Sequence, residues 1–180
     1  MSGGVRTLIP AFWVVMMLAL VPGCGTVGGD ATGGGVKTLP RPDAVEQRVV
    51  ELVNDARSKG RKCGAVQYRP APPLRWDERL ARAALEHSRS MAKHGFLGHK
   101  GPDGRSAGDR VAQLGYRWSA VGENVGQGPK TPEETVRMWL ESERHCRNIM
   151  SPEFREAGAA SARSSSLRTY WTLVFGTKQR

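Results

Sequence analysis

The stretch YWTLVF at residues 170–175 decides the fold, because its aromatic and branched side chains favour an extended strand. Three serines at 164–166 precede it, and the segment from Gly158 to Arg163 lies on their other side. Two strand-like segments around a short polar turn are typical of a β-hairpin. We therefore predict a hairpin, and with it a sheet, in the later part of the chain.

Helices are predicted ahead of this hairpin. The first begins with Asp43 as its N-cap and stops at Gly60, and the second begins near Asp77 and stops at Gly95. In the first helix, the residues that recur at helical spacing are Val45, Val49, Leu52, Val53 and Ala56. In the second helix, one face holds Leu80, Ala84, His87 and Met91. His87 is therefore predicted to point inward.

Further elements lie between this helix and the hairpin. Ser106 and Asp109 fit the start of a short helix that Gly115 closes, and residues 116–128 are predicted to form a strand followed by a glycine-rich turn. The sequence TPEE at 131–134 is a strong helix start, because threonine caps and proline suits the first helical position. One face of that helix holds Val136, Trp139 and Leu140, and Glu143 continues it. Helices first and strands last predict an α+β fold with helices packed on a sheet.

The first part of the chain is predicted to direct export. Leu8 to Val21 is apolar apart from Pro10, and its 14 residues are fewer than the about 20 that a membrane-spanning helix needs. The run ends in VPGC at 21–24, which looks like a bacterial lipoprotein cleavage site with Cys24 as the diacylated residue. We predict a lipoprotein-type signal peptide at 1–23, a flexible Gly-rich linker at 24–42 and a folded domain at 43–178. The alternative is ordinary secretion with an unmodified Cys24.

The chain is basic, with 27 Lys and Arg residues against 17 Asp and Glu residues. Such a charge favours contact with anionic surfaces, although bases that are spread evenly along a chain also suit an ordinary solvated surface. The sequence holds no nucleic-acid-binding motif, so nucleic acid is not expected as a partner. We predict a lipoprotein of the bacterial cell envelope, on its periplasmic or surface side, with the membrane as a partner through the lipid anchor.

Two cysteines, Cys63 and Cys146, remain if Cys24 carries lipid. In an exported domain a pair of cysteines is most simply a disulfide, which would close a loop of 83 positions. Two unpaired buried thiols are the alternative. The CxxC spacing of a zinc knuckle is absent.

Three residues are candidates for chemistry: His99 in a loop, Glu123 between glycines, and His145 beside Cys146. Two imidazoles and a carboxylate that converge in a cavity can hold zinc or another divalent metal, or can transfer protons near neutral pH. Spacings of 24 and 22 residues do not show convergence by themselves. No HExxH or GxSxG motif is present. The other two histidines, His87 and His94, are interpreted as a core and a surface residue.

Six segments, taken in order, resemble the CAP superfamily of cysteine-rich secretory proteins, antigen 5 and pathogenesis-related class 1 proteins. The likeness is to the bacterial SCP-like branch and covers the chain from about Asp43 to Thr177. The segments are LVNDAR (52–57), PPLRWDERLARAALEHSRSMA (72–92), FLGHKGPDGRS (96–106), GYRWSAVGENVGQG (115–128), MWLESERHCRNIMSPEFREAG (138–158) and YWTLVFG (170–176).

The resemblance implies a three-layer α–β–α sandwich with a cavity into which His99, Glu123 and His145 map. Eukaryotic members have a second glutamate three positions after the helix tryptophan, where this chain has Ser142. Glu143 faces the same way as the tryptophan by helical geometry, so it is a candidate to replace that glutamate in the cavity. The candidate metal ligands are His99 and His145.

Three functions remain open on the sequence. The first is an envelope-tethered module that binds a lipid, glycan or protein ligand, with a divalent metal as an optional element. The second is a metal-assisted or acid–base hydrolase acting on envelope peptides or polysaccharides, in which Glu123 orients water. The third is a structural or interaction protein whose cavity has no role.

Overall fold

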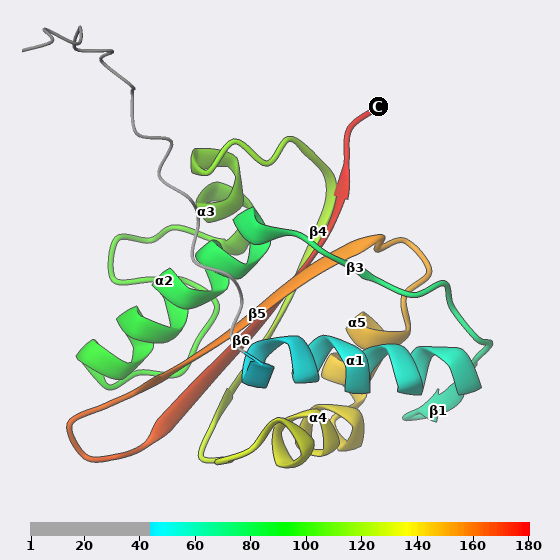
Figure 1. The fold of residues 1–180 in the computed structure, drawn as a ribbon, viewed down its shortest axis with the longest axis horizontal. Helices are drawn as coiled ribbons and strands as arrows, with labels where there is room; N and C mark the ends of the chain where they lie inside the picture. Colours follow the sequence, from blue (N-terminus) through cyan, green and yellow to red (C-terminus); the bar gives the residue numbers. More distant parts are fainter. Residues whose placement is uncertain (1–43) are drawn as a thin grey trace, which may run out of the picture. The chain divides into compact units, whose positions relative to one another are not determined.

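The computed structural model describes residues 44–180. The predicted signal peptide at 1–23, the predicted linker at 24–42, the lipidation site Cys24 and the predicted cap Asp43 lie outside the described residues. The described part is built in three layers, with a four-stranded sheet between two groups of helices (Figure 1). The predicted α+β class and three-layer arrangement are therefore confirmed. Within residues 44–180, no helix combines the length and the apolar character needed to cross a membrane.

The sheet has the strand order β3-β5-β6-β4. The four strands are β3 (Arg75–Trp76), β4 (Trp118–Gln127), β5 (Glu156–Arg163) and β6 (Thr169–Lys178). The last two form the predicted hairpin, while β4 pairs with the other edge of β6 and β3 joins β5 in parallel. Helices cover both faces of β6, so its residues 169–176 are all buried. This burial explains why the segment has so few polar side chains.

One face of the sheet is covered by α2 (Glu78–His94) and α3 (Ala107–Gln113) (Figure 1). Asp77 caps α2, Gly95 ends it in the left-handed conformation with φ 67°, and His87 lies on its buried face, as predicted. α2 comes so near β5 that a Cβ on Gly158 would lie 2.0 Å from the backbone nitrogen of Ala81. A glycine is therefore required where helix and strand cross.

The other face is covered by α1 (Ala44–Lys59), α4 (Pro132–Glu141) and α5 (Glu143–Met150). Their apolar side chains enclose Trp139 and Trp171 in the larger core. The end of α1 before Gly60 and the start of α4 after Thr131 confirm the prediction. Val45, which was predicted to belong to the apolar stripe of α1, is 47% exposed because it lies in the first turn.

Two features differ from the sequence prediction. Residues 116–128 were expected to form a strand followed by a glycine-rich turn, but β4 continues to Gln127 and pairs with β6 from Ala120 onward without a break. A small hairpin of β1 (Arg61–Cys63) and β2 (Val66–Tyr68) was not predicted. Strands of three residues leave too short a pattern to recognise.

Candidate functional site

The loop after α2, strand β4 and the first turns of α5 enclose a cleft of about 700 Å³. It brings together His99, Glu123 and His145, which are 24 and 22 residues apart in the sequence. The other polar residues of its lining are Ser142, Arg144, Arg147 and Asn148. The cleft is thus polar, open to solvent and mainly basic.

Glu123 lies in the floor of the cleft, with its side chain only 4% exposed. One carboxylate oxygen, Oε1, is 2.9 Å from Nδ1 of His99, and the other, Oε2, accepts a hydrogen bond of 2.5 Å from Arg110. The His99 ring itself is 58% exposed. A buried carboxylate therefore holds the ring of an accessible histidine in a fixed orientation.

Arg110, on α3, is the cation that makes this buried carboxylate tolerable. It is buried, and it also donates hydrogen bonds to the backbone carbonyls of His99 and Arg105, so it fixes the loop as well as the carboxylate. Arg110 was not predicted as a site residue from the sequence. The sequence pattern indicates only that some cation is needed, because a glutamate inside a buried strand requires a cationic partner. It does not indicate which arginine or lysine that partner is.

His87 is buried and contacts two residues that line the cleft, Gly98 and Glu123. Its Nε2 lies 2.7 Å from the carbonyl oxygen of Gly98, so Nε2 carries the hydrogen, and the buried Nδ1 has no hydrogen-bond partner among the described residues. Burial lowers the pKa of His87, which keeps the ring neutral beside Glu123 at 3.9 Å. His94, at the end of α2, is exposed and lies outside the lining of the cleft.

His145 lines the same cleft as His99, from the first turn of α5. Burial, together with the nearby charges of His99 and Arg144, lowers the pKa of His145. Its backbone carbonyl accepts a 3.1 Å hydrogen bond from the buried Asn124, and Asn148 in turn donates to the carbonyl of Glu123 and the side chain of Asn124. The two asparagines therefore tie α5 to β4, and so His145 to Glu123.

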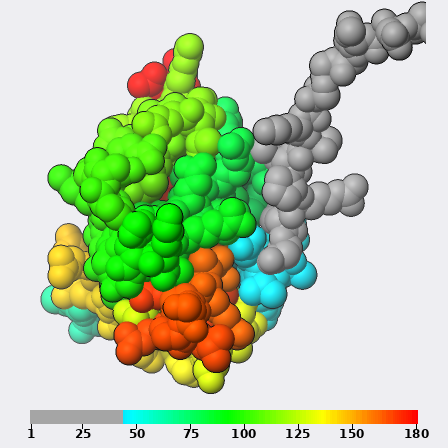
Figure 2. Space-filling view, turned by 90° about the vertical axis from the view of Figure 1, so that its left-hand side faces the viewer, coloured from blue at the N-terminus to red at the C-terminus, as the bar shows by residue number. Residues whose placement is uncertain are grey.

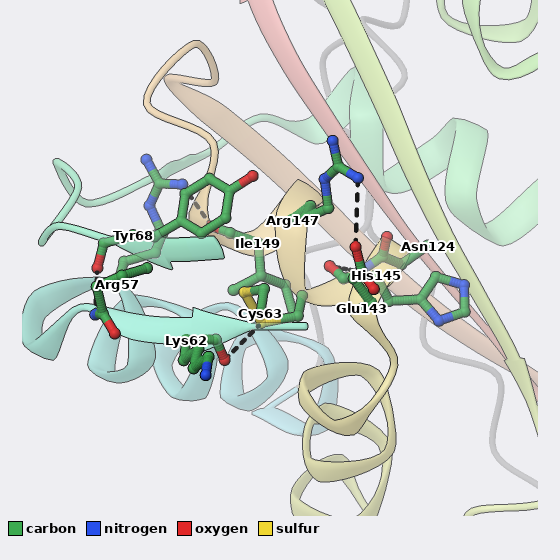
Figure 3. Close-up of a disulfide and its surroundings, with 11 residues drawn as sticks. Arg57, Lys62, Cys63, Tyr68, Asn124, Glu143, His145, Arg147 and Ile149 are labelled. Atoms are coloured by element: carbon green, nitrogen blue, oxygen red, sulfur yellow. Dashed lines mark hydrogen bonds and ion pairs between the residues drawn. A yellow bond between two sulfur atoms is a disulfide. The ribbon is translucent and has the colours of Figure 1, made fainter. Parts of the chain in front are cut away.

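The other side of α5 is fixed by the predicted disulfide between Cys63 and Cys146, whose Cα atoms are 5.6 Å apart. Arg57 of α1 is fully buried and donates hydrogen bonds of 2.6 Å and 2.8 Å to the carbonyls of Ile149 and Ser151 at the end of the helix. Burial lowers the pKa of Arg57 to about 10, so it keeps its charge. Figure 3 shows the His145 ring pointing away from the disulfide. α5 is therefore held rigidly behind the cleft.

Glu143 does not lie where the sequence predicted. The helix of Trp139 ends at Glu141, Ser142 adopts an extended conformation, and Glu143 begins a new helix, so helical spacing from Trp139 no longer applies. Its carboxylate packs over Gly64 and pairs with Arg147 at 3.6 Å, on the disulfide side of α5 (Figure 3). Glu143 is not part of the cleft lining.

The fit of a divalent metal depends on His99 and His145. The Nδ1 of His99 is engaged by Glu123, which leaves its Nε2 for a ligand, as in many metal-binding histidines. Among residues 44–180, however, no group of three or more His, Cys, Asp or Glu side chains could hold a metal ion. Catalytic zinc sites have three protein ligands and structural ones four, so two imidazoles do not fit a resident zinc ion.

A second hollow, of about 360 Å³, meets the first at His99 and Glu123. Its wall includes Trp118, which is 38% exposed and donates a hydrogen bond to the carbonyl of Gly108. The two hollows together extend the cleft across His99. Such a shape suits a ligand that is longer than a single small molecule.

Comparisons with known proteins match this fold. Residues 50–175 match the family model described as CAP, the cysteine-rich secretory protein family. YkwD of Bacillus subtilis is 35% identical over 132 residues, which is 73% of this chain and 47% of YkwD. A second Bacillus subtilis relative, the membrane protein YlbC, is 24% identical over 63% of this chain and 30% of its own length. The chain thus spans less than half the length of these curated relatives.

Solved structures share the architecture. An extracellular protein with an SCP domain from Bacillus anthracis has a TM-score of 0.63 and 25% identity, covering 74% of this chain and 40% of its own. NaASP2, solved with Zn²⁺, has a TM-score of 0.52 and 14% identity, covering 77% of this chain and 84% of its own. The second likeness concerns the fold alone.

Proposed function

The chain belongs to the cysteine-rich secretory protein (CAP) family, and from that premise we propose that it is an exported binding domain whose cleft holds an extended, negatively charged ligand of the cell envelope. The family resemblance predicted from the sequence is confirmed by the match over residues 50–175. Export is supported by the relative from Bacillus anthracis, an extracellular protein with an SCP domain. The candidate ligands are a lipid, a glycan and a protein segment.

The charge of the cleft is the observation that carries this proposal. Arg144 and Arg147 line it, of which Arg147 also pairs with Glu143, whereas Glu123 is the one carboxylate among its lining residues and is already neutralised by Arg110. Ser142, which lines the cleft at the start of α5, makes no side-chain capping bond, and the first N–H groups of a helix have no partner within the helix. Cations and free N–H groups together favour a phosphate or carboxylate group.

Zinc is not required by this proposal. NaASP2 was solved with Zn²⁺, but the two imidazoles of this cleft offer one protein ligand fewer than a catalytic zinc site needs. His99 and His145 instead serve as hydrogen-bonding groups, with His99 oriented by Glu123. Because the His99 ring is already oriented, it binds an anionic or hydroxyl-bearing group without a conformational change of the protein.

The proposal is tested by calorimetric titration of the full chain with a short glycerol phosphate oligomer and with an uncharged gluco-oligosaccharide. We expect binding of the anionic oligomer, and a loss of about tenfold or more in Arg144→Gln, because a hydrogen bond to a charged group contributes about 1.5–3 kcal/mol. The matched control is Arg69→Gln, which removes an exposed arginine outside the cleft lining. Equal affinity for both oligomers, or equal losses in both variants, would contradict an anion-binding cleft.

Acid–base hydrolysis is the second candidate, favoured by one observation. The pKa of His145 lies below its ordinary value, so its ring is neutral at pH 7 and able to accept a proton in the cleft that the His99–Glu123 pair also lines. This function predicts release of soluble fragments from labelled cell-wall material by the wild type. Release should fall at least about a hundredfold in His145→Ala. Unchanged release in that variant would exclude His145 as the base.

A further inference from the structure

One end of the domain carries an exposed surface that the cleft does not use. The β5–β6 hairpin contributes Arg163 at the end of β5 and Leu167 and Arg168 in its turn, and the second half of α2 contributes Arg89 and Lys93. Arg89, Lys93 and Arg163 line the same shallow hollow of about 320 Å³, so the hairpin and the helix form a continuous surface. Figure 2 shows the hairpin in orange beside α2 in green. We refer to these five residues as the hairpin patch.

The four cations of the hairpin patch have no anionic partner among residues 44–180. In the part of the chain that the structure describes, none of them lies within ion-pair distance of a carboxylate. Some surface arginines elsewhere are paired, as Arg48 is with two glutamates and Arg105 with Asp103, so the patch stands out by the grouping of its unpaired cations at one end of the domain. Four neighbouring unpaired cations repel one another, and an anionic surface would remove that repulsion.

Leu167 adds an apolar contact at the tip of the patch. It is 74% exposed, more than any other large hydrophobic residue among those described, and its φ of 60° is the one positive value of a non-glycine residue there. Backbone hydrogen bonds from Leu167 to Ser164 and from Ser164 to Arg168 hold this turn. A leucine kept in a strained turn and facing water suits insertion into a lipid interface, whereas a hydrophilic polymer offers nothing for it to bury in.

The hairpin also lies where the chain enters the fold. Glu46, in the first turn of α1, accepts a 3.4 Å hydrogen bond from the backbone of Ser161 in β5. The start of α1, in cyan, lies next to the hairpin in Figure 2. The predicted lipidation site Cys24 precedes Ala44 by 20 residues, and a Gly-rich linker of that length would reach about 25 Å if it behaves as predicted. An anchor at Cys24 would therefore keep this end of the domain within reach of the bilayer.

We propose that the hairpin patch docks the domain on a bilayer that contains anionic phospholipids, with Arg163, Arg168, Arg89 and Lys93 at the phosphates and Leu167 in the interface. The docking is a second membrane contact that orients the domain, separate from the anchor and from the cleft. A basic patch alone binds membranes weakly, so the predicted diacylated anchor would hold the domain at the bilayer while the patch sets its orientation.

The test uses the full chain attached to vesicles of phosphatidylcholine, with or without phosphatidylglycerol, and measures amide hydrogen exchange of residues 161–169. We expect slower exchange with phosphatidylglycerol, which high salt reverses. Arg163→Gln with Arg168→Gln should lower the docked-to-free ratio about 25-fold, since each cation near an anionic surface accounts for about fivefold. Arg163→Lys with Arg168→Lys should retain most of the protection. Lys62→Gln with Arg69→Gln makes the same change of charge at exposed positions of the distant β1–β2 hairpin and should have no effect.

Leu167→Ser separates a membrane from a soluble polyanion. It should reduce the protection on phosphatidylglycerol vesicles, because the apolar contact is lost while all four charges remain. Equal exchange on both kinds of vesicle would overturn the proposal. So would protection by a soluble glycerol phosphate oligomer that Leu167→Ser leaves unchanged, since the patch would then be a polyanion site.

Discussion

A nitrogen of the Arg110 guanidinium lies 2.5 Å from Oε2 of Glu123, and both side chains are almost completely buried beneath the cleft. The carboxylate accepts this bond on one oxygen and contacts His99 with the other. The orientation of the accessible histidine thus depends on an arginine that itself never reaches the cleft surface. A charge pair in such a position is costly to break from one side only.

Arg110→Met should therefore lower the free energy of unfolding by about 3–5 kcal/mol, because it leaves the Glu123 carboxylate buried without a cation. Urea denaturation measures this loss. The double variant Arg110→Met with Glu123→Gln should lose less, since no unpaired charge remains. Equal losses in the single and double variants would show that the pair contributes only through its packing.

Removal of the Cys63–Cys146 bond should lower the free energy of unfolding by about 2–5 kcal/mol. The bond closes a loop of 83 positions and fastens β1 to α5. Cys63→Ala with Cys146→Ala makes the comparison, and Cys24→Ala is the control, because Cys24 lies outside the described fold. An unchanged urea midpoint in the double variant would mean that packing alone holds α5.

Gly158→Ala should destabilise the fold by about 3 kcal/mol or prevent folding, because the added methyl would overlap the backbone of α2 at Leu80 and Ala81. Thermal unfolding measures the effect. Gly98→Ala is the matched control, since the atom nearest to its added Cβ is 3.9 Å away. If the two variants lost equal stability, the close crossing of α2 and β5 would not be the cause.

Stability should fall as the pH drops below about 6.5, partly through His87, whose pKa is lowered by burial from 6.5. As the pH falls through that range, His87 is protonated in the unfolded protein before it is protonated in the folded protein. The stability from keeping the ring neutral is thus complete above pH 6.5 and is lost as the pH falls towards the lower folded pKa. One such group contributes at most about 1.4 kcal/mol per pH unit.

His87→Gln tests this dependence, because an amide can still donate to the carbonyl of Gly98 but does not titrate. Urea denaturation at several values from pH 5 to pH 7.5 should show a shallower decline in this variant than in the wild type. Parallel pH profiles would assign the acid sensitivity to other groups.

Zinc should bind the wild type only weakly, with a dissociation constant above the micromolar range, because two imidazoles supply too few ligands. Calorimetric titration of the full chain measures this, with His99→Ala and His145→Ala to locate any binding. Micromolar binding that disappears in both variants would contradict the two-ligand geometry and would favour a metal site.

The helices were predictable because local chemistry marks their ends. Asp77 and Gly95 bound α2, and the Ser106–Asp109 capping box begins α3, as sequence patterns alone indicated. The strand β4 was predicted only in its first half. Its glycines resemble a turn, yet the buried neighbours Asn124 and Val125 and the pairing with β6 keep them extended. Tertiary pairing here overrides local preference.

The cleft was only partly predictable. Its two histidines and Glu123 were identified, but Arg110 and the asparagine pair were not, since their roles come from contacts across the fold. Glu143 was wrongly assigned because helical spacing was continued through Ser142, where the backbone turns extended. A helix break without glycine or proline leaves little mark in a sequence.

The place of β6 in the sheet has a consequence for the timing of folding. It is the last strand along the described chain, yet it lies between β4 and β5, which do not pair with each other. A chain that appears from its N-terminal end, as during synthesis, therefore holds β4 and β5 without their common partner until β6 has also appeared. The sheet closes only through contacts that are distant in sequence, so folding of the domain waits for almost the whole chain.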